Sequence, residues 1–178
     1  MAFISVPENL PGIHGPLAFR PEVAEGMRGF TQVLMRGPSS LSVAERELIA
    51  AYVSRLNGCS FCYQSHASTA RYLFGADAAV VDAVIADLES APVDERMRAL
   101  LCIAATVQRD ARCVTQEDAD AARAAGADDV AIHDTVLVAA AFCMFNKYVD
   151  GLGTDAPDDP AVYAATAAER AGRGYRPG

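Results

Sequence analysis

Two consecutive helices, at about 42–56 and 59–74, are the feature that most constrains how this chain folds. Ser42 and Glu45 have the spacing of a capping box, which predicts the start of the first helix. Asn57-Gly58 ends that helix, because glycine readily adopts the backbone conformation that a helix end requires. The second helix begins directly after this turn. The chain is therefore expected to contain two helices that are joined by a tight turn and pack against each other.

The rest of the chain also predicts helices. Apolar residues make up 52% of the sequence, tryptophan is absent, and runs of β-branched residues are short, which is typical of packed helices rather than a sheet. We therefore expect an all-α protein with a compact multi-helix fold. Start and stop signals place its further helices at 21–35, 77–88, 92–108, 116–125, 128–149 and, as a short alanine-rich helix with a tail, 160–178.

A length of 178 residues is typical of one domain. Prolines and glycines break any regular period at the beginning of the chain, so residues 1–20 are expected to form an extended N-terminal arm. Residues 21–153 are expected to form the helical domain. Residues 154–178 are expected to contribute a C-terminal linker, a short helix and a tail.

Charge and hydropathy exclude several classes of partner. The formal net charge of −8 disfavours nucleic acid and anionic lipid, which bind clustered lysine and arginine. The N-terminus resembles no signal peptide, and the longest apolar run, residues 136–145, is too short to cross a membrane. We expect a cytoplasmic protein, in which a CxxC pair more often performs redox or metal chemistry than forms a permanent disulfide.

The segment NGCSFCYQSH places three reactive side chains on one helix face. Cys59, Cys62 and His66 are three and four residues apart, so they point in the same direction and line a partly buried pocket. Cys62 has both the helix N-terminus and His66 nearby, so it is the predicted nucleophile with His66 as its base, within hydrogen-bond reach. Cys59 is close enough to attack an oxidised Cys62 and form a disulfide.

Glu47 is the candidate for the group that orients His66. It lies on the small-residue side of the preceding helix, beside Ala50, Ala51 and Ser54, where another helix can approach closely. The bland alternative is an ordinary solvated helix charge. If Glu47 does contact His66, the result is a Glu-His-Cys relay with a second thiol, which suits peroxide reduction through a sulfenic acid and an internal disulfide.

Two stretches, ERELIAAYVSRLNGCSFCYQSHA and VTQEDADAARAAGADDVAIHDTVLVAAAFCMFNKYVDGLG, resemble the alkylhydroperoxidase D-like, carboxymuconolactone decarboxylase-related family in its peroxidase-related branch. The resemblance covers roughly residues 19–153. It implies an all-helical subunit that forms homo-oligomers, with Cys62 as peroxidatic cysteine, Cys59 as resolving cysteine, and Glu47 and His66 as the proton relay. It also implies a hydroperoxide substrate, re-reduction by an external dithiol or disulfide reductase, and no metal, haem or flavin cofactor.

The sequence departs from the family pattern at two positions. The best-known members carry a histidine between the two cysteines, where this chain has Phe61, so one possible relay member is missing. Lys147 stands where many relatives have arginine.

Several alternative interpretations stay open at this level. The two cysteines could be buried hydrophobic residues, or Cys59, Cys62 and His66 could bind zinc in a helical interaction module, although no fourth ligand is evident. The family resemblance also allows a decarboxylase-type acid/base enzyme, whose members generally lack the CxxC pair. His14 is interpreted as a residue without a role, His133 as a surface residue rather than a catalyst, and the remaining cysteines as core or incidental thiols.

Overall fold

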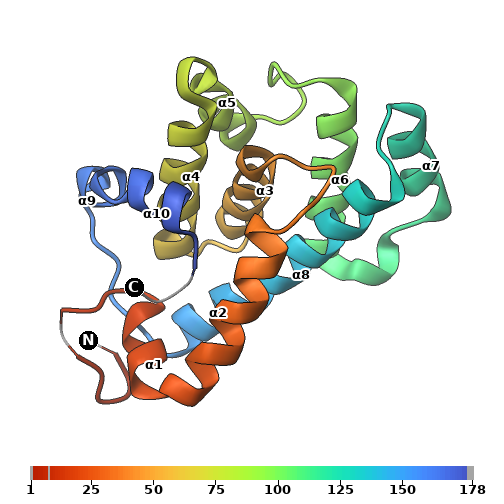
Figure 1. Ribbon diagram of the computed structural model, residues 1–178. Helices are drawn as coiled ribbons and strands as arrows, with labels where there is room; N and C mark the ends of the chain where they lie inside the picture. Colours follow the sequence, from red (N-terminus) through yellow and green to blue (C-terminus); the bar gives the residue numbers. More distant parts are fainter. Residues whose placement is uncertain (1, 8, 176–178) are drawn as a thin grey trace.

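The computed structural model describes residues 2–7 and 9–175, and this part of the chain contains helices and connecting turns but no strand (Figure 1). The prediction of an all-α protein is confirmed. In chain order the elements are α1 His14–Phe19, α2 Pro21–Arg36, α3 Val43–Leu56, α4 Ser60–Phe74, η1 Gly75–Asp77, α5 Ala79–Ala86, α6 Glu95–Asp110, η2 Ala111–Cys113, α7 Gln116–Ala124, α8 Asp129–Gly151, α9 Pro160–Ala165 and α10 Ala167–Arg173.

Helix α3 is the centre of the fold. It packs against α2, α4, α5, α6 and α8, and both its large and its small residues are buried, among them Leu48, Ile49, Ala50 and Ala51. Its closest neighbour is α4, which follows it after the Asn57-Gly58 turn. The small residues of α3 let the backbones of the two helices approach closely. The site residues on both helices are therefore held in the most densely packed part of the molecule.

Helix α8 is the other long core element. By length and composition alone it could cross a membrane, but 44% of its most apolar window is buried inside the fold. There Val138, Phe142 and Phe145 belong to the core that α3 and α6 share with α8. Core packing thus accounts for a large part of its apolar character.

Side-chain caps determine where α3 and α6 begin. At α3 the predicted capping box is formed: Ser42 N–H donates to Glu45 Oε2 at 2.7 Å, and Glu45 N–H donates to Ser42 Oγ at 3.2 Å. The expected start of a helix at Pro92 is wrong. Helix α6 begins at Glu95 because the Asp94 carboxylate accepts a hydrogen bond from Met97 N–H at 2.7 Å and acts as the N-cap.

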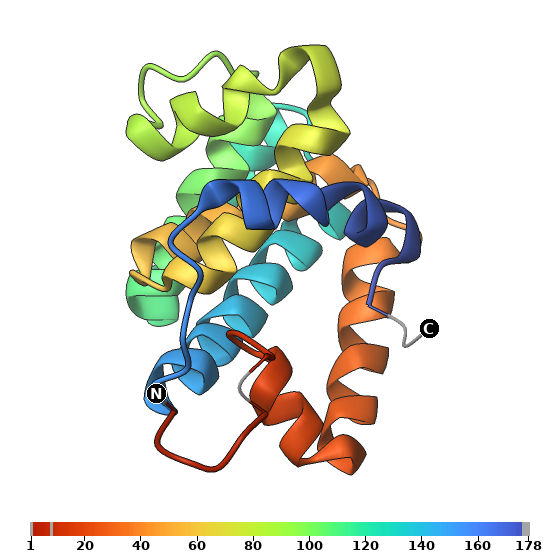
Figure 2. The same ribbon diagram turned by 90° about the vertical axis from the view of Figure 1, so that its left-hand side faces the viewer.

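Two segments near the ends of the chain differ in detail from the prediction. The N-terminal arm is not extended throughout, because residues 14–19 form α1. After the linker, residues 160–173 form two short helices, α9 and α10, which lie across α4 (Figure 2). Residues 176–178 of the predicted tail lie outside the described residues.

Phe61 holds the N-terminal arm in place. Gly12 has a positive φ of 56°, and a Cβ atom added there would lie 2.1 Å from Cγ of the Phe61 ring. Gly12 N–H also donates to the carbonyl of Asp155 at 2.8 Å, which joins the arm to the C-terminal linker. The arm therefore depends on glycine at position 12, both for its backbone conformation and for the close approach of the aromatic ring.

We predict that Gly12→Ala lowers the free energy of unfolding by about 1–3 kcal/mol, because the new methyl group clashes with Phe61 and the backbone becomes strained. Gly26→Ala is the matched control, since a Cβ atom there meets nothing within 4 Å, and it should raise stability by up to about 1 kcal/mol. Urea unfolding of both variants checks this. Equal effects of the two substitutions on the free energy of unfolding would contradict the close packing of the N-terminal arm against Phe61.

Candidate active site

The turn between α3 and α4 is fixed by a chain of amide hydrogen bonds. Gln108 Nε2 donates to Asn57 Oδ1 at 2.9 Å, and Asn57 Nδ2 donates to Asn146 Oδ1 at 2.7 Å. Asn146 Nδ2 in turn donates to Ser54 Oγ at 3.1 Å. Asn57 therefore does more than end a helix: its side chain links α6 and α8 to the turn that carries the cysteines.

Cys59 is the N-cap of α4, with extended backbone angles, and its N–H donates to the carbonyl of Ser54 at 3.1 Å. Cys62 lies one turn into the helix. The predicted placement of the CxxC pair at a helix N-terminus is confirmed, and the first helical residue is Ser60. Both cysteines are free thiols in this structure.

The two thiols have different surroundings. Cys59 is completely buried among Phe61, Val149 and Tyr163, whereas Cys62 lines a pocket. The adjacent Cys62 sulfur and burial together raise the pKa of the Cys59 thiol well above its ordinary value. Cys59 therefore keeps its proton, and Cys62 is the sulfur that a molecule in the pocket meets.

Glu47 is buried, with 1% of its surface exposed, and its carboxylate is bonded on both oxygens. His66 Nδ1 lies 2.6 Å from Oε2, and Arg36 Nη2 lies 2.7 Å from Oε1. The Tyr175 hydroxyl also donates to Oε1, at 3.0 Å. Burial alone would raise the pKa of Glu47, but the charges and hydrogen bonds of His66 and Arg36 outweigh it and lower this pKa to about 2. Glu47 is thus an ionised, buried carboxylate rather than a solvated helix charge.

The imidazole of His66 is held between Glu47 and an aromatic wall. An ionised carboxylate only accepts hydrogen bonds, so Nδ1 carries the proton that it shares with Glu47, and Nε2 is left for other partners. The ring meets Phe142 edge-on, with centroids 4.5 Å apart. The expected direct hydrogen bond between His66 and Cys62 is not formed, since none links the ring to either sulfur among the described residues. Instead, both side chains face the same pocket.

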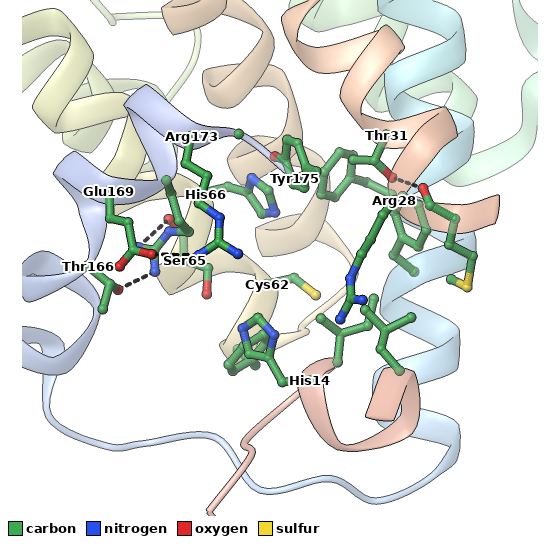
Figure 3. A pocket seen from close by; sticks show the side chains of 18 residues that line it. His14, Arg28, Thr31, Cys62, Ser65, His66, Thr166, Glu169, Arg173 and Tyr175 are labelled. Atoms are coloured by element: carbon green, nitrogen blue, oxygen red, sulfur yellow. Dashed lines mark hydrogen bonds and ion pairs between the residues drawn. The ribbon is translucent and has the colours of Figure 1, made fainter. Parts of the chain in front are cut away.

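This pocket has a volume of about 620 Å³ and lies between the N-terminal helices, α4, α8 and the C-terminal segment (Figure 3). His14 belongs to its wall, where burial and the nearby arginines Arg170 and Arg28 lower its pKa. The expectation that His14 lies in an extended arm is wrong, because it begins α1 and lines this pocket. The lining residues are Ile13, His14, Leu17, Met27, Arg28, Thr31, Phe61, Cys62, Ser65, His66, Phe142, Phe145, Thr166, Glu169, Arg170, Arg173, Gly174 and Tyr175.

The geometry gives no support to a zinc site. Among residues 2–7 and 9–175, no group of three or more His, Cys, Asp or Glu side chains is placed to hold a metal ion. Cys59, Cys62 and His66 share a helix face without converging on one point. His133 is exposed and pairs with Asp134, and Lys147 is exposed and does not line the pocket.

Two residues of the site were missed by sequence reasoning. Arg36 ends α2, the helix before α3, and Tyr175 follows α10 at the other end of the chain; both contact the Glu47 carboxylate. The Arg36 guanidinium also lies over the Tyr175 ring, 5.1 Å from its centroid. Burial and Glu47 raise the pKa of Tyr175, so its hydroxyl remains a donor. The sequence carries no local signal for either contact.

Comparison with known proteins supports the family resemblance. A sequence model of the Carboxymuconolactone decarboxylase family matches residues 21–105. The crystal structure of an uncharacterized peroxidase-related protein from a Silicibacter species is similar, with a TM-score of 0.78 and 30% sequence identity over 86% of this chain and 78% of that chain. An uncharacterized peroxidase-related protein from Ralstonia eutropha, described as an alkylhydroperoxidase AhpD core, has a TM-score of 0.78 and 25% identity over 88% and 80%.

A protein of unknown function from Agrobacterium tumefaciens shares the fold, with a TM-score of 0.70 over 81% of this chain and 97% of that chain, at 21% identity. No functionally curated protein matches the sequence. The site thus sits in a fold of peroxidase-related proteins. The chain belongs to the alkylhydroperoxidase D-like, carboxymuconolactone decarboxylase-related family, in its peroxidase-related branch.

We predict that Glu47→Gln lowers the free energy of unfolding at neutral pH by about 3–5 kcal/mol, because it leaves the Arg36 guanidinium buried without its charged partner. The effect depends on pH. Since the folded-state pKa of Glu47, about 2, lies below its ordinary value of 4.5, the ionised carboxylate stabilises the protein above about pH 4.5, and this stabilisation is lost as the pH falls towards 2.

The gap in unfolding free energy between the two proteins should therefore narrow by about 3 kcal/mol on acidification from neutral pH. Urea unfolding at a series of pH values measures it. A gap that stays constant with pH would contradict the assigned charge state of Glu47.

We predict that Tyr175→Phe lowers the free energy of unfolding by about 1–2 kcal/mol, because it removes one hydrogen bond to the ionised Glu47 carboxylate and leaves the ring in place. Tyr72→Phe is the matched control, because Tyr72 is 55% exposed and should tolerate the change within about 0.5 kcal/mol. Thermal or urea unfolding of the two variants compares them. If both variants were equally stable, the hydrogen bond between Tyr175 and Glu47 would make no contribution to the stability of the fold, which contradicts the prediction.

Proposed function

We propose that the protein is a thiol-dependent hydroperoxide reductase that works through a Cys59–Cys62 disulfide, with Glu47 and His66 moving protons. The observation that carries the proposal is the contact of the buried Glu47 with His66, 2.6 Å between Oε2 and Nδ1, where His66 lines the same pocket as the Cys62 thiol. The peroxidase-related relatives support it, since they share this fold.

The proposed reaction has two chemical steps before re-reduction. In the first, the Cys62 thiolate attacks the outer oxygen of the hydroperoxide; the O–O bond breaks, Cys62 becomes a sulfenic acid, and the alkoxide takes up a proton and leaves as an alcohol. In the second, the Cys59 thiol gives up its proton as its sulfur attacks the Cys62 sulfur; the S–O bond breaks, and the leaving hydroxide takes up a proton and departs as water. An external dithiol then reduces the disulfide and becomes oxidised itself.

The difference between the two thiols supports their order in this scheme. Cys62 lines the pocket, and its position one turn into α4 lets the helix N-terminus stabilise a thiolate. Cys59 is buried and protonated, does not line the pocket, and lies next to the Cys62 sulfur. A thiol in this position suits disulfide formation after Cys62 has been oxidised.

His66 acts on the pocket rather than on the sulfur directly. Its Nδ1 is occupied by Glu47, so the proton that the leaving alkoxide needs is exchanged at Nε2, either with the substrate oxygen or through a bound water. Glu47 fixes the orientation of the ring and the nitrogen that carries the shared proton, as a carboxylate does for a catalytic histidine elsewhere. Phe61 supplies no proton, so the relay rests on this pair alone.

Assembly into homo-oligomers in the cytoplasm is part of the same proposal. Helix α2 exposes Val23, Phe30 and Val33, and α8 exposes Val130 and Met144, so each helix has apolar surface that another subunit could cover. Size-exclusion chromatography with light scattering measures the subunit number. A monomer at micromolar concentration would contradict this part of the proposal.

The decarboxylase-type alternative uses acid/base groups without redox turnover. It is favoured by the family model that matches residues 21–105, but it assigns no task to the paired thiols. Alkylation with iodoacetamide separates the two functions. Activity that survives complete alkylation of Cys62 would favour the alternative.

We predict that one equivalent of cumene hydroperoxide removes two hydrogens from the reduced protein, mapped by mass spectrometry to a Cys59–Cys62 disulfide. Cys59→Ser should instead accumulate a sulfenic acid on Cys62 that dimedone traps. Cys62→Ser should abolish peroxide consumption with a dithiol reductant. Cys102→Ser, which changes an exposed thiol, is the control and should behave as the unmodified protein. Retained turnover in Cys62→Ser would refute the assignment of the nucleophile.

A further inference from the structure

The pocket is larger than hydrogen peroxide needs. Its volume of about 620 Å³ lies in the range of sites for organic molecules. Much of the wall is apolar, with contributions from four parts of the chain: Ile13, Leu17, Met27, Phe61, Phe142 and Phe145. Such a wall binds the apolar body of an organic ligand through removal of its surface from water.

Arg28 is a charged residue on the inward side of α2. The inward side of this helix carries Ala24, Thr31 and Met35, all buried, and Arg28 falls on the same side at helical spacing. Three large apolar residues of the helix, Val23, Phe30 and Val33, are exposed instead. A guanidinium on the inward face of a helix is unfavourable unless it meets a partner.

Arg28 has no such partner within the described chain. Its side chain is half-buried, lines the pocket, and points to the same space as the Cys62 sulfur and the ring of His14 (Figure 3). No hydrogen bond or ion pair involves its guanidinium among residues 2–7 and 9–175. An arginine fork that is open towards a pocket matches the geometry of a carboxylate.

The other charges around the pocket also favour an anionic ligand. Arg170 also lines the pocket, but its guanidinium donates to neutral oxygens, those of Thr69 at 3.0 Å and of the Tyr163 carbonyl at 2.8 Å. The lining contains three arginines and one glutamate, Glu169, which pairs with Arg173. In a chain of formal net charge −8, the pocket is a local region of positive charge.

We propose that the pocket binds an organic anion, with the apolar body against the aromatic and aliphatic wall and a carboxylate bonded to Arg28, beside Cys62. This inference rests on the proposed function for its chemical meaning, and it then narrows the substrate class to hydroperoxides that carry an anionic group. An unreactive carboxylate of similar size should bind Arg28 in the same way as the substrate anion. Binding can therefore be measured separately from turnover.

Calorimetric titration of the full-length reduced protein with decanoate and with 1-decanol tests the site. The two probes have the same chain length, and only decanoate is charged. Decanoate should bind about tenfold more tightly than decanol, and Arg28→Gln should remove this preference by weakening decanoate about tenfold and leaving decanol unchanged. Arg112→Gln, at an exposed arginine of η2, is the matched control and should bind as the unmodified protein does.

The proposal is overturned if decanoate binds no more tightly than decanol, or if Arg28→Gln and Arg112→Gln affect decanoate equally. Arg28→Lys provides a second variant, which keeps the charge without the fork and should retain part of the preference. A circular dichroism spectrum unchanged from that of the parent protein verifies the fold of each variant.

Kinetics with a matched pair of hydroperoxides distinguishes a ligand contact from an effect on the thiolate. Arg28→Gln should raise KM about tenfold for linoleic acid hydroperoxide and leave kcat/KM for its methyl ester unchanged. Equal loss with both substrates would mean that Arg28 acts on Cys62, which overturns the proposal. If decanoate binds as expected but no hydroperoxide oxidises Cys62, the anion site stands and the proposed reductase function fails.

Discussion

The buried carboxylate of Glu47 is the interaction on which the rest of the site depends. A buried charge is costly by several kcal/mol unless cations and donors surround it. Here the partners come from three other segments: Arg36 ends α2, His66 lies in the middle of α4, and Tyr175 follows α10. Satisfying one carboxylate thus fixes the end of α2, the register of α4 against α3, and the return of the C-terminal segment over both helices.

The local part of this arrangement was predictable from the sequence. Ser42 and Glu45 satisfy each other within one helical turn, and Asn57-Gly58 ends α3 directly before Cys59, so both signals are complete in short stretches. Glu47 was predictable only with the help of the family resemblance. Its place among small residues on α3 indicated a helix contact, but a glutamate on a helix is ordinarily solvated, and the family's pattern of a glutamate before the CxxC pair and the histidine decided for a role. The structure places the Glu47 carboxylate against His66 on the next helix.

What the sequence could not predict depends on contacts between distant residues. Tyr175 is 128 residues from Glu47, and no periodic pattern connects them. The start of α6 was missed because two local signals compete, and the hydrogen bond accepted by Asp94 outweighs the preference of Pro92 for a first helical turn. The segment around His14 has no regular period, so the sequence does not predict that His14 begins α1 and lines the pocket.

Phe61 connects the chemistry of the site with the shape of the pocket. Its ring packs against Gly12, and it meets His14 and Tyr163 edge-on, at centroid distances of 5.7 Å and 6.0 Å. The side chain between the two cysteines therefore anchors both the N-terminal arm and α9, where the family's best-known members carry a histidine. In this chain, position 61 therefore contributes to the wall of the pocket. In the proposed function this leaves His66 as the residue that exchanges the proton.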